Sequence, residues 1–214
     1  MPATSIVRTG LTFITAVAAL YAGTALLPSA EAGGATTDQT TSRSAPHRTT
    51  LTFEVPDCEG CELTLTQARW DDSARYGVRV WDGPSGKVRD GKVAFTVPSK
   101  RTWGMSVAVA APWDGALAAA TTVAFRYAGH GVGDVVTFRD ARDERRASAC
   151  WEGTRRDAVT VPLTVRKVRV DGVRGRVDGS IAFATTTEGW LQPMRRTYRG
   201  VLASQDVNVC GPRG

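Results

Sequence analysis

Residues 92–98 read Lys-Val-Ala-Phe-Thr-Val-Pro (KVAFTVP), a segment in which apolar side chains occupy every second position. In an extended strand, successive side chains point to opposite faces. Val93, Phe95 and Val97 therefore share one face, and the even-numbered residues share the other. The segment predicts a half-buried β-strand.

The same period of two recurs along the chain, whereas no stretch of twelve or more residues has the 3.6-residue period of an amphipathic helix. Turn signals of Gly, Pro or Asp-Gly separate the alternating segments about every 8 to 14 residues. These segments contain Leu63 and Leu65, Val78 and Val80, Val107 and Val109, Val123, Phe125 and Tyr127, and Val161, Leu163 and Val165. We predict an all-β fold, an antiparallel β-sandwich of immunoglobulin-like or similar Greek-key type.

The segment 161–170 changes the parity of its apolar positions between Val165 and Val168. A one-residue slip exchanges the two faces of a strand, and a β-bulge restores the original face. We therefore expect a bulge near Arg166 and Lys167.

Two segments resemble each other and suggest an internal repeat. VRVWDGPSGKVRDGKVAFT (78–96) aligns, with small gaps, with VRVDGVRGRVDGSIAFA (168–184). The Asp-Gly pairs at Asp82, Asp90, Asp171 and Asp178 would then form equivalent turns. Two arrangements stay open: one sandwich over 51–210, which we favour, or pseudo-repeated halves at 51–133 and 134–210.

Residues 1–32 have the order of regions found in a secretory signal peptide. One basic residue, Arg8, precedes the apolar run 11–27, and Ala30 and Ala32 supply the small residues that signal peptidase accepts. We expect cleavage after Ala32, and hence a secreted or extracellular protein that begins at Gly33.

An uncleaved N-terminal membrane anchor is the alternative, because about 17 apolar residues lie near the lower limit for crossing a bilayer. Threonine and glycine residues within the run, and the lack of a basic cluster after it, favour cleavage. We expect no membrane span after signal cleavage.

Residues 33–50, GGATTDQTTSRSAPHRTT, are rich in threonine and serine and almost free of apolar side chains. Such a segment cannot bury enough surface to offset the entropy that it would lose on ordering. It predicts a disordered linker, followed by a folded domain over 51–210.

The four cysteines predict two disulfides in an oxidising compartment, Cys58–Cys61 and Cys150–Cys210, although four cysteines allow three connectivities. A redox role for Cys58-Glu-Gly-Cys61 is disfavoured, because acidic neighbours oppose a thiolate. Zinc is disfavoured, because no second Cys-x-x-Cys exists. We expect no metal site and no cofactor.

The chain carries a formal net charge of +6, and its basic residues concentrate toward the C-terminus. Residues 51–137 hold nine Lys and Arg against ten Asp and Glu, whereas residues 138–214 hold fifteen against nine. Three arginine pairs contribute: Arg145 and Arg146, Arg155 and Arg156, and Arg195 and Arg196. If they converge, they form an anion-binding face; the alternative is solvated loops.

Six tryptophans are present, and Trp103, Trp113 and Trp190 adjoin glycine or proline in expected loops. Loop tryptophans can stack on sugar rings, so these three are candidates for glycan binding. Packing in the core or against a sheet is the alternative that we favour for tryptophan in general.

Catalysis of the Ser-His-Asp or Cys-His type would have to use His130, because the only other histidine, His47, lies in the expected linker. A carboxylate pair such as Asp71 and Asp72 is the other candidate for acid-base work. The chain lacks G-x-S-x-G, S-x-x-K and H-E-x-x-H motifs. A non-catalytic protein is therefore favoured over a hydrolase-like enzyme acting in a cleft between sheets.

The stretches VPDCEGCELTLTQARWD, KVAFTVPSKRTWGMSVAVAAPW and SACWEGT, with the signal peptide and the Thr/Ser-rich linker, resemble small secreted proteins of actinomycetes. The resemblance implies an exported β domain and assigns no role to any residue. We expect an envelope-associated binding or structural module, with a cell-envelope glycopolymer or an anionic surface as partner. Nucleic acid is disfavoured, because no aromatic-basic platform of a known module is present.

Overall fold

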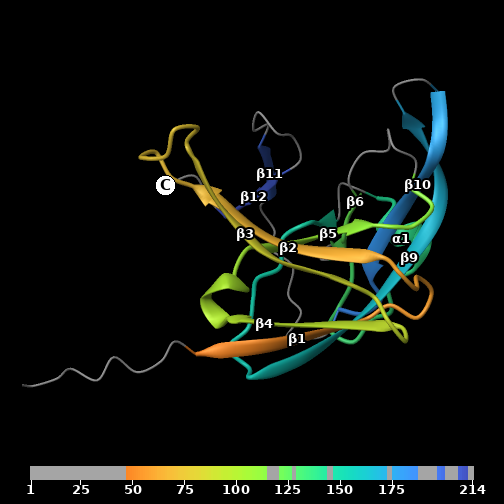
Figure 1. Cartoon of the computed structure of the whole chain (residues 1–214), viewed down its shortest axis with the longest axis horizontal. Helices are drawn as coiled ribbons and strands as arrows, with labels where there is room; N and C mark the ends of the chain where they lie inside the picture. Colours follow the sequence, from red (N-terminus) through yellow and green to blue (C-terminus); the bar gives the residue numbers. More distant parts are fainter. Residues whose placement is uncertain are drawn as a thin grey trace, which may run out of the picture. The chain divides into compact units, whose positions relative to one another are not determined.

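The alternating segments form strands in two large sheets in the computed structural model of the chain, which confirms the all-β prediction (Figure 1). The structure describes residues 47–114, 121–126, 129–143, 147–172, 175–187, 197–200 and 207–211. The expected signal peptide and linker residues up to 46 lie outside these ranges. Within them, no helix has the length and apolar character needed to cross a membrane.

The first sheet has the strand order β10-β9-β1-β4. Its strands are β1 (Arg48–Glu54), β4 (Lys92–Pro98), β9 (Ala158–Gly172) and β10 (Gly175–Ala184). β1 pairs antiparallel with β4 and parallel with β9, and β9 forms an antiparallel hairpin with β10. The KVAFTVP segment is thus β4, an edge strand of this sheet.

The second sheet is built around β2 (Glu62–Trp70). One edge of β2 pairs with β3 (Val78–Lys87), and the other with β5 (Met105–Ala110) and, at Ala68, with β12 (Val207–Cys210). β6 (Thr121–Thr122) extends the sheet beyond β5, and β11 (Thr197–Gly200) extends it beyond β12. The short elements are η1 (Ser99–Arg101), β7 (Phe125–Arg126), α1 (Phe138–Ala141) and β8 (Ala147–Ser148).

Most strand pairs are antiparallel, as the sequence predicts, but two are parallel: β1 with β9, and β2 with β12. In both pairs, the partners lie far apart in the sequence, and parallel neighbours require such long connections. An alternating pattern records which side chains are buried and contains no information on strand direction. The fully antiparallel expectation is therefore wrong for these two pairs.

Side chains from both sheets form one buried hydrophobic cluster. The rings of Phe53 and Phe95 meet edge to face, with centroids 6.1 Å apart. The first sheet contributes Leu51, Phe53, Phe95, Val97, Val161, Leu163 and Val165, and the second contributes Leu63, Leu65, Met105, Val107 and Val109. Most of the positions that alternate in the sequence point into this core, whereas Val78 and Val80 pack in a smaller cluster with Ala68 and Val209.

One stretch of chain joins the hydrogen-bonded ladders of the two sheets. β6 pairs with β5, and Ala124, just beyond β6, forms a parallel bridge with Phe183 of β10. The Ala124 N–H donates to the Ala182 carbonyl at 2.9 Å, and the Ala184 N–H donates to the Ala124 carbonyl at 3.0 Å. The outer edge of β10 is therefore paired at Ala182–Ala184.

The bulge expected near Arg166 and Lys167 is absent, because β9 and β10 pair without a shift of register along the whole hairpin. Val168 and Val170, the apolar residues with the changed parity, are half-buried on the face opposite the main core. Val165 faces the main core, whereas Arg166, on the opposite face, lies over the Phe138 ring at 5.3 Å. A second buried cluster of Val136, Ala141 and Phe183 forms beside α1.

The two segments compared as a repeat adopt different pairings. Residues 78–96 contain β3 and β4, which belong to different sheets, whereas residues 168–184 contain the end of β9 and β10, which pair with each other. Asp82 and Asp178 lie inside strands, not at turns. The four Asp-Gly pairs are therefore not equivalent. β1 and β9, from the two proposed halves, are neighbours in one sheet and contribute to one core.

The first strand begins earlier than the sequence suggested. Residues 48–50 belong to β1 and not to the linker, and Thr49 is fully buried. The linker boundary at residue 50 is thus wrong by three residues, because the compositional signal for a polar linker also covered strand-forming threonines.

Both predicted disulfides are present, Cys58–Cys61 and Cys150–Cys210. All four cysteines are at least 98% buried. The burial of Cys58 and Cys61 agrees with a structural role, because thiol exchange requires an accessible sulfur.

Candidate functional site

Three segments distant in sequence meet at one end of the first sheet, where β1 and β9 begin and β4 ends (Figure 1). The Thr49 hydroxyl connects all three, since it lies 2.7 Å from the Ser99 hydroxyl and donates to the Arg156 carbonyl at 2.9 Å. The Thr154 N–H donates to the Thr102 hydroxyl at 3.0 Å. We call the surface formed by residues 47–49, 99–102 and 154–157 the basic junction.

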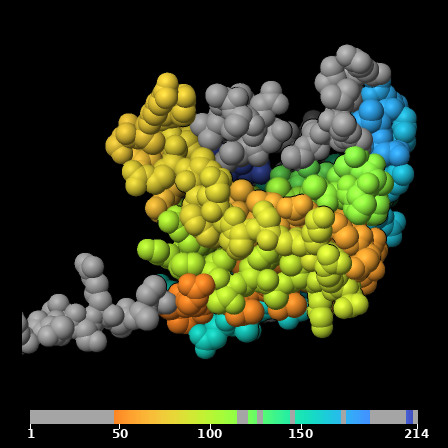
Figure 2. All heavy atoms as spheres, viewed as in Figure 1, coloured from red at the N-terminus to blue at the C-terminus, as the bar shows by residue number. Residues whose placement is uncertain are grey.

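The basic junction carries five cationic side chains that form no ion pair with any described carboxylate. They are Arg48, Lys100, Arg101, Arg155 and Arg156; Arg101 is half-buried and the others are exposed. In Figure 2, the start of β1 (orange) is at the surface beside the yellow-green atoms of the segment that ends β4. Uncompensated charges of one sign on one surface produce a positive potential that attracts anions.

Buried Gln67 fixes the η1 part of this surface from below. Its amide nitrogen donates to the Trp103 carbonyl at 2.5 Å and to the Lys100 carbonyl at 3.3 Å. Its amide oxygen accepts from Arg101 at 3.1 Å, and the Arg101 guanidinium lies 5.2 Å from the centre of the Trp81 ring. These contacts hold Arg101 in place and leave its charge unneutralised.

Asp157 is the carboxylate within the basic junction, and it pairs with His47 at 2.8 Å. The other ring nitrogen of His47 lies within hydrogen-bond distance of the Ser99 hydroxyl. His47 therefore belongs to this surface, although the sequence placed it in the linker. The five cations outnumber this one acidic group.

The β9–β10 hairpin also carries several basic residues, but three of them lie beside carboxylates. Asp178 pairs with Lys167 at 2.8 Å and with Arg169 at 2.9 Å, and Arg176 lies 3.9 Å from Asp171. The hydrogen bond from Lys167, followed by the one from Arg169, lowers the pKa of Asp178 below its ordinary value. Lys167, Arg169 and Arg176 thus each have a nearby carboxylate, unlike the five cations of the basic junction.

The structure describes only one of the three arginine pairs named from the sequence. Arg155 and Arg156 lie on the basic junction, whereas Arg145, Arg146, Arg195 and Arg196 lie outside the described residues. The sequence did not suggest Arg48, Lys100 or Arg101 for this surface. No local signal could have found them, because they join Arg155 only through the pairing of β1 with β4 and β9.

The candidate glycan-stacking tryptophans do not form one platform. Trp103, which is 42% exposed, precedes β5, and Trp113 follows it, so the length of the strand separates them. The Trp113 N–H donates to the Ser180 hydroxyl at 3.0 Å, and its ring packs against the core. Trp190 lies outside the described residues. Of the two candidates that the structure describes, Trp103 adjoins the basic junction, since it directly follows Thr102.

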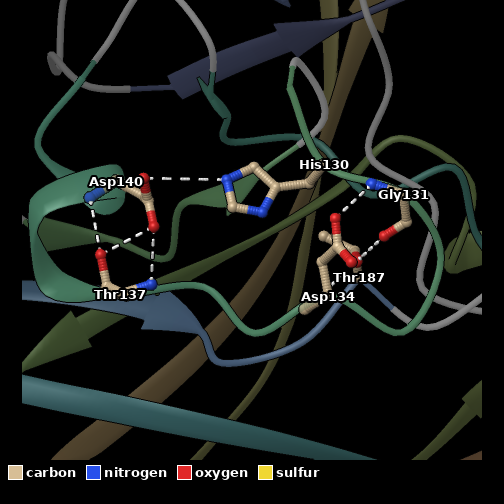
Figure 3. A network of polar contacts seen from close by, with 6 residues as sticks. All are labelled: His130, Gly131, Asp134, Thr137, Asp140 and Thr187. Carbon is tan, nitrogen blue, oxygen red and sulfur yellow. Dashed lines mark hydrogen bonds and ion pairs between the residues drawn. The ribbon is translucent and has the colours of Figure 1, made fainter.

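His130 lies beside a short polar network that caps α1 (Figure 3). Its Nε2 atom is 3.8 Å from the Asp140 carboxylate, and its side chain is 12% exposed. The same carboxylate accepts from the Thr137 N–H at 2.9 Å and from its hydroxyl at 2.7 Å. Because Asp140 closes this capping box, its geometry serves the start of the helix.

The loop around His130 is held by a second set of contacts. The Gly131 N–H donates to the Asp134 carboxylate at 2.7 Å, and the Thr187 hydroxyl donates to the Gly131 carbonyl (Figure 3). In the described part of the chain, no serine, threonine or cysteine is hydrogen-bonded to the His130 ring. The arrangement resembles a braced loop more than a nucleophile with its base.

The carboxylate pair does not face a partner across a cleft. Asp71 accepts from the hydroxyl of Ser73 and pairs with Arg79 at 2.7 Å, while Asp72 is exposed in the same turn. The Ser73 hydrogen bond is the main cause of a lowered pKa at Asp71, which opposes a role as a general acid. Among the described residues, no group of three His, Cys, Asp or Glu is placed to hold a metal ion.

No family model, no curated protein and no solved structure matches this chain.

Proposed function

We propose that this protein is a secreted, non-catalytic module that binds an anionic polymer of the cell envelope through the basic junction. The observation that carries the proposal is the set of five cations without carboxylate partners at the meeting point of β1, η1 and the segment before β9. Export is an expectation from residues 1–32, and two disulfides are compatible with an oxidising environment.

A polymer suits this surface better than a small anion. The cations come from three chain segments, and the described residues place no buried cation in a closed site there. Exposed charges individually contribute little binding energy, about 0–1 kcal/mol each, so affinity requires several simultaneous contacts. A repeating polyanion provides such contacts, and its binding must weaken as salt screens the charges.

Binding to isolated anionic envelope material at increasing salt tests the proposal. Arg155→Gln/Arg156→Gln should lower the affinity about three- to tenfold at low salt, in line with the loss of two exposed contacts. Lys167→Gln/Arg169→Gln is the control, because it also removes two positive charges, but these are paired with the Asp178 carboxylate and lie outside the basic junction. The proposal would be contradicted if both double variants lost the same affinity. It would also be contradicted if the retention of the protein on envelope material did not change with salt.

An extracellular hydrolase acting through His130 is the second candidate function. It is favoured by one observation, the 3.8 Å approach of His130 to Asp140 in a mostly covered position. His130→Gln should abolish the turnover of any substrate found for the protein if this candidate is correct. If His130 only braces the loop, the variant loses thermal stability and retains binding to envelope material.

A further inference from the structure

We infer that the ligand of the basic junction is an acidic polysaccharide, in which a sugar ring stacks on Trp103 while neighbouring anionic groups contact the cations. The inference rests on the proposed function and specifies the chemical class of its ligand. Trp103 directly follows Thr102, whose hydroxyl donates to the Thr154 carbonyl at 3.2 Å. The backbone at Trp103 is therefore joined both to η1, which carries Lys100 and Arg101, and to the segment that leads to Arg155.

The backbone of Trp103 is held firmly. Its carbonyl accepts from buried Gln67, and a Cβ atom at Gly153 would approach the Trp103 nitrogen to 2.7 Å. Gly153 also has a φ of +89°, a conformation that favours glycine. Only glycine therefore permits this close approach of the two segments.

The Trp103 ring is fixed on its other side by the end of β12. A Cβ atom at Gly211 would lie 3.0 Å from the Cη2 atom of Trp103, and Gly211 directly follows Cys210 of the long disulfide. The ring is thus supported on one side and is still 42% exposed. An aromatic side chain that is already ordered loses little entropy when a ligand binds.

The two parts of this surface call for different chemistry in the same ligand. An indole face offers a broad apolar surface, which suits the C–H face of a sugar ring. The cations require phosphate, sulfate or carboxylate groups. A simple polyanion would leave Trp103 unused, and a neutral glycan would leave the cations unused. An acidic polysaccharide satisfies both.

A lipid surface is a poorer match. Interfacial membrane binding requires several apolar side chains on one face. Besides Trp103, the large exposed apolar residues of the described ranges are Tyr76, Val132 and Val135. Val132 and Val135 lie in the His130 loop, and Tyr76 lies at the end of the β2–β3 hairpin, which projects in yellow in Figure 2. None adjoins Trp103 in the chain.

The test compares the full chain with Trp103→Ala on two anionic probes, dextran sulfate, which has sugar rings, and polyphosphate, which has none. Trp103→Ala should weaken binding to dextran sulfate about fivefold, the size expected for one aromatic contact, and binding to polyphosphate less than about twofold. The affinity of Trp103→Phe for dextran sulfate should lie between those of the natural sequence and Trp103→Ala. Tyr76→Ala, another exposed aromatic residue, is the matched control and should bind both probes like the natural sequence.

The outcomes separate the inference from the proposed function. Suppose that Arg155→Gln/Arg156→Gln weakens binding to both probes. If Trp103→Ala then weakens binding to neither probe, or to both by the same factor, the inference is wrong and the proposed function stands. If neither probe binds, the proposed function fails and the inference fails with it. If Trp103→Ala weakens binding to phosphatidylglycerol vesicles but not to dextran sulfate, the inference is wrong and the ligand is a lipid surface. Thermal unfolding of Trp103→Ala shows whether a general loss came from misfolding.

Discussion

At the scale of single residues, Thr49 shows how one buried hydroxyl can hold a surface together. It is fully buried, and its oxygen contacts the Ser99 hydroxyl and the Arg156 carbonyl. Valine has nearly the same shape as threonine but cannot form hydrogen bonds. The substitution therefore isolates the contribution of these two contacts.

We expect Thr49→Val to lower the free energy of unfolding by about 1–3 kcal/mol, because it removes both hydrogen-bond contacts of a fully buried hydroxyl. Urea denaturation measures the loss. Thr52→Val, on the outer face of the same strand, is the control and should change stability by no more than about 0.5 kcal/mol. Equal effects at the two positions would show that the Thr49 hydroxyl contributes little.

Asp178 gives a pH-dependent prediction at the same scale. The Lys167 and Arg169 hydrogen bonds lower its pKa in the folded protein from the ordinary value of 3.8. A carboxyl with a lowered pKa stabilises the fold above its unfolded pKa, and the contribution is lost as the pH falls through the folded pKa. Asp178→Asn should therefore lower the melting temperature at pH 7 and have little effect near pH 2.

Because the side chains of this ion pair are partly exposed, the effect of Asp178→Asn is expected to be small and reduced by salt. Asp171→Asn is the control, since Asp171 is almost fully exposed and lies 3.9 Å from Arg176. A difference between the natural protein and Asp178→Asn that persists unchanged at pH 2 would refute the assigned cause.

At the scale of elements, the sequence predicted the strands wherever a single face is buried. Phe95 and Val97 in β4 and Leu63 and Leu65 in β2 alternate in the sequence and are buried in the structure. The bulge prediction failed for β9, where an unbroken strand carries buried apolar residues at odd positions and half-buried ones at even positions. The prediction of strand direction failed for a different reason. Side chains alternate in the same way in parallel and antiparallel strands, so the pattern does not distinguish the two.

The two disulfides should differ in their effect on stability, because they close loops of different length. Cys150–Cys210 spans 60 residues and holds β12, whose pairing with β2 involves one residue pair. On the chain-entropy model, removing it costs about 4 kcal/mol, whereas removing Cys58–Cys61 costs about 2. Urea denaturation of Cys150→Ala/Cys210→Ala and Cys58→Ala/Cys61→Ala measures both losses, and the reverse order would contradict loop entropy as the main cause.

At the scale of the whole molecule, the candidate site could be predicted only where its residues are neighbours in sequence. Arg155 and Arg156 form an evident basic pair, but Arg48 and Lys100 reach the same surface through long-range pairing. A sequence pattern indicates that a strand exists, and the identity of its neighbour depends on the packing of the entire core. The site is therefore a product of topology more than of any motif.

The same topology makes the start of the folded unit part of the proposed binding surface, which shortening the chain can test. The compact unit begins at Ser44, and residues 47–50 supply His47, Arg48, the buried Thr49 and part of the pairing of β1. A chain beginning at Ser44 should unfold with the same free energy as one beginning at Gly33. A chain beginning at Leu51 should lose at least about 3 kcal/mol, since buried hydrogen bonds and strand pairing disappear together.

The shortened chain should also bind dextran sulfate more weakly, and Arg48→Gln in the longer chain separates the two causes. If charge alone matters for binding, Arg48→Gln reproduces the weaker binding without the loss of stability. If residues 47–50 act by bracing Ser99 and Arg156, Thr49→Val weakens binding although every charge remains. If the chains that begin at Ser44 and Leu51 are equally stable, residues 48–50 do not contribute to the folded domain. Arg48 is then not part of the basic junction.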